Sequence, residues 1–63
     1  MPTITRIAPG FYDVTYGDRT VEIENRKDVG GWVARATWSR NEYSDPLRTY
    51  AEAKQWAIET LSE

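Results

Sequence analysis

Polar and apolar residues alternate over two neighbouring segments near the start of the chain. Tyr12, Val14 and Tyr16 occupy alternate positions in residues 11–16, as Val21 and Ile23 do in residues 19–25, which is typical of strands with one buried face. Gly17-Asp18 lies between the two segments. Glycine accepts the positive φ that a two-residue hairpin turn requires. The pattern therefore predicts a β-hairpin over residues 11–25.

The register of this hairpin follows from the length of its turn. A two-residue turn pairs Tyr16 with Arg19, Val14 with Val21, and Tyr12 with Ile23. The apolar partners then share one face of the sheet. A slip of one residue would place Val14 opposite Thr20 and lose that match.

A third strand is predicted over residues 32–38, after a polar loop that ends in two glycines. If Asn25 lies opposite Trp32, the core-face pairs are Ile23 with Ala34 and Val21 with Ala36. On the other face Glu22 meets Arg35, and an opposite-charge cross-strand pair of this kind contributes about 0.2–1 kcal/mol.

A helix is predicted over residues 49–62. Thr49 and Glu52 have the spacing of a capping box, in which the threonine hydroxyl accepts the Glu52 amide proton. Apolar residues then follow at helical spacing and make one stripe. These residues are Tyr50, Ala53, Ala57, Ile58 and Leu61.

The order of these elements predicts an α+β fold, a three-stranded antiparallel meander with one C-terminal helix packed on one face. We expect a single domain with an N-terminal lead (1–9), a sheet (10–38), a loop (39–48) and the helix (49–62). Ala34 and Ala36 are small enough to form a floor beneath the helix. Trp32 and Trp38 would then close the two sides of the groove, the alternative being a pair that grips a ligand.

Composition excludes several functions. The 63 residues include no cysteine and no histidine, which removes disulfides, the commonest metal ligand and the usual proton shuttle at neutral pH. We therefore expect no enzyme activity, no cofactor and no metal site. No segment is long and apolar enough to span a membrane. The net charge is −2, and the charged residues are spread along the chain without a basic arm or an acidic tail. We therefore expect a soluble cytoplasmic protein.

What remains is binding. We expect a non-enzymatic protein–protein interaction module, with a partner that the sequence does not identify. Trp56 lies off the apolar stripe of the helix, and exposed aromatic residues are enriched at interface hot spots; the alternative is that it packs over the sheet edge. Asp13, Glu22 and Arg35 would share the outer sheet face. Free strand edges in a small sheet also make a homodimer a reasonable expectation.

The segment 31–36 (GWVARA), followed by 49–57 (TYAEAKQWA), resembles the AP2-like N-terminal domain of phage-type tyrosine integrases. That family has a W-x-A-R-type strand and a helix that opens with T-x-x-E-A-x-x-W. The resemblance covers residues 10–61 in architecture and about fifteen positions in motif. It implies the same fold, an origin as a small phage-like accessory protein, located in the host cytoplasm, and a nucleic-acid-binding domain as the alternative function.

The outer sheet face departs from the family pattern. In the integrase family this face carries arginine and lysine into the DNA major groove, whereas here it has three acids against one base. Binding to duplex DNA draws much of its affinity from neutralising phosphates, so the acidic face disfavours it. The basic residues available for the alternative function are Arg26, Lys27, Arg35, Arg40 and Arg48.

Overall fold

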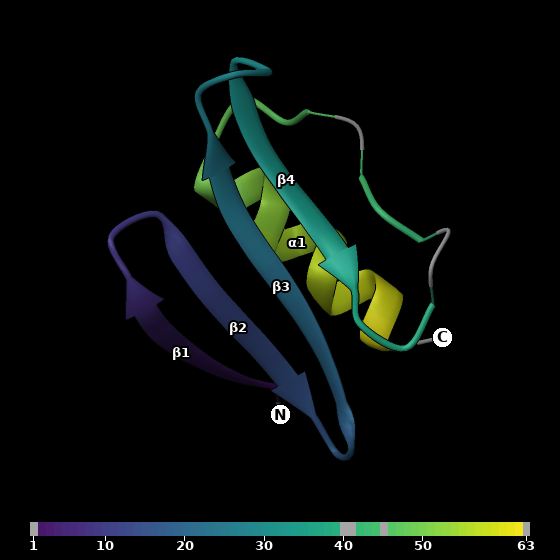
Figure 1. The fold of residues 1–63 in the computed structure, drawn as a ribbon. Coiled ribbons are helices and arrows are strands. Elements are labelled where there is room, and N and C mark those ends of the chain that lie inside the picture. Colours follow the sequence, from purple (N-terminus) through teal and green to yellow (C-terminus); the bar gives the residue numbers. More distant parts are fainter. Residues whose placement is uncertain (1, 40–41, 45, 63) are drawn as a thin grey trace.

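The computed structural model describes residues 2–39, 42–44 and 46–62, and it has an antiparallel sheet with one helix on one face (Figure 1). The strands lie in chain order across the sheet. They are β1 (Thr3–Ala8), β2 (Phe11–Tyr16), β3 (Arg19–Arg26) and β4 (Gly31–Ala36), and the helix is α1 (Tyr50–Leu61). The α+β fold with its C-terminal helix is confirmed.

The expectation of three strands is wrong, because the predicted N-terminal lead forms β1. Pro9-Gly10 is the turn of a second hairpin, and Gly10 has the left-handed φ of 81° that suits glycine there. β1 pairs antiparallel with β2 from Thr3 to Ala8. Its residues alternate too weakly in polarity to predict a strand, since as an edge strand it exposes nearly every side chain.

Both predicted registers are confirmed. Across β2 and β3, Tyr16 lies opposite Arg19 and Val14 opposite Val21. Across β3 and β4, Asn25 lies opposite Trp32. Their agreement with the apolar pattern reflects the period of two along a strand, because a slip of one residue would turn the polar side chains towards the core.

The strand predicted over residues 32–38 is β4, and it ends at Ala36, before Trp38. After Ala36 the chain turns, with the Thr37 amide and hydroxyl both donating to the Thr20 carbonyl (3.1 and 2.7 Å). Trp38 therefore lies beyond the strand and is 39% exposed. The guanidinium of Arg19 lies 5.3 Å from its ring centre. The expectation that Trp38 forms the second wall of the helix groove is wrong.

The core lies between α1 and strands β2, β3 and β4. Ala34 is fully buried and Ala36 nearly so, which confirms the predicted floor of small side chains. Trp32 stands at one end of this floor, where its ring lies 5.4 Å from that of Tyr50 and 6.2 Å from that of Tyr12. The Tyr12 and Tyr50 rings are 4.4 Å apart, so three aromatic side chains close this end of the core.

The predicted helix and its cap are confirmed in outline. α1 begins after Thr49, whose hydroxyl accepts the Glu52 amide proton at 3.2 Å. Trp56 is half-buried and packs against the core cluster. This contact with the core leaves part of the side chain exposed, so packing over the sheet edge stays a prediction.

Candidate functional site

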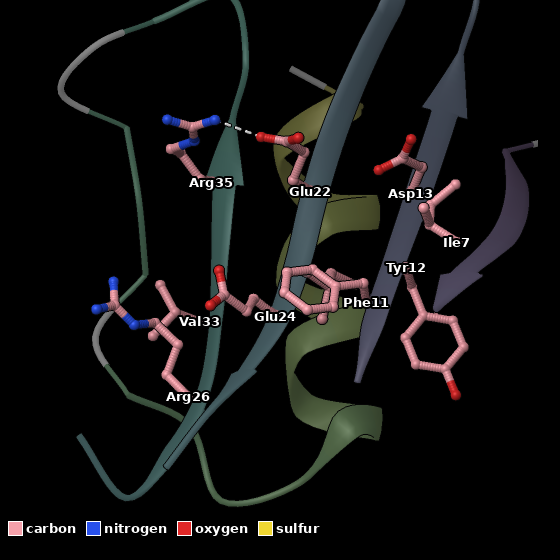
Figure 2. Close-up of a pocket in the computed structure, with 10 residues that line it drawn as sticks. Ile7, Phe11, Tyr12, Asp13, Glu22, Glu24, Arg26, Val33 and Arg35 are labelled. Atoms are coloured by element: carbon pink, nitrogen blue, oxygen red, sulfur yellow. Dashed lines mark hydrogen bonds and ion pairs between the residues drawn. The ribbon is translucent and has the colours of Figure 1, made fainter. Parts of the chain in front are cut away.

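The face of the sheet opposite α1 carries a hollow of about 430 Å³ (Figure 2). No helix or strand covers this face within the described residues, and we call it the open face. Strands β1 to β4 all contribute to the hollow. Its lining residues are Ile7, Phe11, Tyr12, Asp13, Glu22, Ile23, Glu24, Arg26, Val33 and Arg35.

The apolar part of the hollow comes from three side chains. Phe11, at the start of β2, is 46% exposed, and Val33 reaches the same face from β4. Ile7 is 60% exposed and lies at an irregularity of β1, where the register shifts between Arg6 and Ala8. Such a bulge re-aims side chains, which explains how Ile7 comes to line the hollow.

The carboxylates of the hollow are arranged unfavourably for the isolated chain. Asp13 lies directly opposite Glu22 in the β2–β3 pairing, and like charges in that position destabilise a sheet. Arg35 of β4 lies opposite Glu22, as predicted, and forms an ion pair with it. Glu24 lies opposite Phe11. Within the part of the chain that the structure describes, no ion pair involves Asp13 or Glu24.

The structure brings together three of the four residues predicted for partner binding. Asp13, Glu22 and Arg35 line the hollow, where Figure 2 shows the carboxylates of Asp13 and Glu22 near the same edge of it. Trp56 belongs to α1 on the opposite side of the sheet and does not join them.

Sequence reasoning gave no functional role to the apolar side chains of the hollow. Phe11 was recognisable, since it is an aromatic residue at a position where strand alternation predicts a solvent-facing side chain. Ile7 had no comparable signal, because the segment before Pro9 was not predicted to be a strand.

The basic residues of the nucleic-acid alternative lie in several places. Arg26 and Lys27 lie where β3 turns towards β4, and Arg48 is close to that end because Leu47 bridges to Trp32. Arg35 belongs to the hollow, and Arg40 lies outside the described residues.

One of these charges is already paired. Arg26 donates two hydrogen bonds to Asp28, at 2.8 and 3.2 Å. These bonds and the charges of Asp28 and Glu24 raise the pKa of Arg26, while the bond from Arg26 lowers the pKa of Asp28. The charge that this end of the sheet offers to a phosphate is therefore reduced.

In the described part of the chain, no three acidic side chains are placed so that they could hold a metal ion together. None of the described helices has the length and apolar character needed to cross a membrane.

Comparison with protein-family models, curated proteins and solved structures gives no match for this chain. The resemblance to the integrase arm-binding domain therefore stays a prediction that rests on its two short motifs.

Proposed function

We propose that this protein is a non-enzymatic interaction module that binds a partner protein through the open face of its sheet. The observation that carries this proposal is the hollow, in which the exposed apolar side chains of Phe11 and Ile7 lie beside carboxylates. Exposed apolar surface rimmed by polar residues is typical of protein-binding sites. The absence of histidine and cysteine from the sequence supports a role without catalysis.

The charges indicate which partner the hollow suits. Glu22 is neutralised by Arg35, whereas Asp13 and Glu24 contribute negative charge beside Phe11. A segment with an apolar side chain next to a lysine or arginine is complementary to this arrangement. The apolar side chain would cover Phe11, and the cation would pair with Asp13 or Glu24, neither of which has an ion pair among the described residues.

The resemblance to the integrase domain suggests that the setting is a phage-like accessory protein.

Site-specific photo-crosslinking in cells of the source organism tests the proposal. We expect a photoreactive residue at position 11 to capture one discrete partner, and the captured peptide to contain lysine or arginine. The matched position is Gln55, an exposed residue of α1, which lies on the other side of the sheet. Equal capture from positions 11 and 55 would overturn the proposal.

Two charge variants sharpen this test. Glu24→Lys reverses the charge beside Phe11, so we expect it to abolish capture from position 11. Glu59→Gln removes a carboxylate from the exposed side of α1 and should leave capture unchanged. Loss of capture in both variants would indicate a general effect of net charge and would count against a specific site.

The second candidate function is binding to a nucleic acid. The gathering of Arg26, Lys27 and Arg48 at one end of the sheet favours it. Non-specific phosphate contacts weaken steeply with salt, so titration of a fluorescent DNA duplex at about 50 mM salt is the most sensitive assay. Binding there that is lost in a Lys27→Ala, Arg48→Ala variant would support this alternative. No binding would exclude it.

A further inference from the structure

The two edges of the sheet differ in whether their backbone groups have partners. At the β4 edge, residues 42–44 and Leu47 lie alongside the strand (Figure 1). Trp32 and Leu47 exchange two hydrogen bonds of 2.8 Å. Ser44 forms hydrogen bonds with both the amide and the carbonyl of Ala34, which point away from β3. The Ala36 amide donates to the Glu42 carbonyl at 2.9 Å. This edge is closed to another strand.

The other edge is β1, and no described segment runs beside it. The helix packs on β2, β3 and β4 and does not reach β1. The Thr20 carbonyl accepts from the Thr37 amide and so faces β4. Because hydrogen-bonding sides alternate across and along antiparallel strands, its β2 partner Thr15 faces β1, and Thr3 and Thr5 direct their backbone groups to β2. Ile4 and Arg6 therefore direct theirs outward. Ile4 also exposes 40% of its surface.

We propose that two copies of the chain pair antiparallel through β1, about a twofold axis at Thr5. In this register Ile4 of each copy lies opposite the partner's Arg6, so each outward amide meets an outward carbonyl. Thr5 lies opposite the partner's Thr5, and threonine pairs are favourable cross-strand neighbours. The aliphatic stem of Arg6 covers the partner's Ile4.

The neighbouring twofold registers are less favourable. An axis at Arg6 places this residue opposite the partner's Arg6, and like charges there repel. An axis at Ile4 brings Pro2 opposite the partner's Arg6, and proline has no amide proton to donate. A twofold axis requires paired residues to share a face, so an axis between two neighbouring residues is excluded. The register at Thr5 is thus selected by the residues of β1.

The resulting dimer has one continuous sheet of eight strands, four from each copy. Its twofold axis is normal to the sheet, so both copies of α1 lie on one side and both hollows on the other. The bulge at Ile7 and the prolines at positions 2 and 9 end the pairing on each side, which keeps the contact short. An interface this small gives a weak, concentration-dependent dimer.

Sedimentation equilibrium of the whole chain tests the dimer. We expect the average mass to rise from one chain towards two as the concentration approaches about 500 µM, the range suited to a small interface. A mass of one chain throughout would overturn the proposal. In Arg6→Pro the outward amide is lost while the β1 donors to β2 remain, so we expect a monomer. Arg6→Gln keeps the amide and should still dimerise. Dimerisation of Arg6→Pro would also overturn the proposal.

A charge pair at the axis tests the register and does not depend on proline. Thr5→Lys alone and Thr5→Glu alone each place like charges opposite each other, so we expect both to be monomeric. An equimolar mixture should form a heterodimer, and circular dichroism should show both variants folded. Dimers of either variant alone, or no association in the mixture of folded variants, would overturn the register. None of these outcomes depends on whether the hollow binds a partner.

Discussion

Ser44 and Ala34 hold each other by two hydrogen bonds, although they are ten residues apart in the chain. The Ser44 amide donates to the Ala34 carbonyl at 2.8 Å, and the Ala34 amide donates to the Ser44 hydroxyl at 2.9 Å. Both residues are buried. The serine side chain thus supplies an acceptor that a neighbouring strand would otherwise provide.

Ser44→Ala should destabilise the fold because it leaves the buried Ala34 amide without an acceptor. We expect the free energy of unfolding to fall by about 1–3 kcal/mol, measured by urea denaturation. Ser62→Ala is the control, since that hydroxyl is exposed and should change stability by less than about 0.5 kcal/mol. Equal effects of the two substitutions would contradict the role of Ser44.

Gly31→Ala should loosen the segment that covers the β4 edge. A Cβ at position 31 would lie 2.6 Å from the Leu47 carbonyl oxygen, so the backbone there must move. We expect a loss of about 1–3 kcal/mol, as for other overpacked sites. Hydrogen exchange should show faster exchange of the Trp32 and Leu47 amides.

Gly30→Asn is the matched control for this prediction. Gly30 has open space around it and a φ of 74°, which asparagine tolerates better than most residues. Protection of the Trp32 amide should therefore be retained. If Gly30→Asn loosened this amide as much as Gly31→Ala, the close contact with Leu47 would not be the cause.

Stability should fall in alkaline solution through Tyr50. Burial raises the pKa of Tyr50, and the nearby Tyr12 adds to the effect. The folded state therefore keeps the phenol neutral at a pH where the unfolded chain has begun to ionise. The stabilisation is complete below the ordinary pKa of about 10 and decreases as the pH rises through the raised value.

Urea denaturation across this pH range measures the effect. Tyr50→Phe cannot ionise, so we expect its stability to fall less steeply above about pH 10. Tyr16→Phe, at an exposed site, is the control and should follow the wild-type slope. A Tyr50→Phe slope equal to that of the wild type would contradict the assignment.

Trp56→Ala should reduce stability and leave partner binding intact. Because Trp56 is half-buried against the core, we expect a loss of about 1–3 kcal/mol, below the cost of truncating a fully buried tryptophan. Capture by a photoreactive residue at position 11 should persist below the unfolding temperature. Unchanged stability with lost capture would instead place Trp56 in the interface.

Local sequence predicts those elements whose formation depends on near neighbours. The turn at Gly17-Asp18 determines the β2–β3 register, and Thr49 with Glu52 marks the start of α1. The pair of Glu22 and Arg35 follows from the next register. Asp13 lies opposite Glu22, so these three residues share one face of the sheet, as predicted.

Tertiary structure decided what happens at the edges of the sheet. β1 has little apolar alternation of its own and forms because β2 offers unpaired backbone groups beside it. Glu42, Ser44 and Leu47 lie in a segment of loop-like composition, yet they supply the hydrogen bonds that β4 needs. The position of Trp38 depends on where β4 ends, and that of Trp56 on how α1 packs against the core. The alternation of side chains along the chain determined which faces are buried, but backbone hydrogen bonds between distant segments determined how many strands the sheet has and which edge stays open.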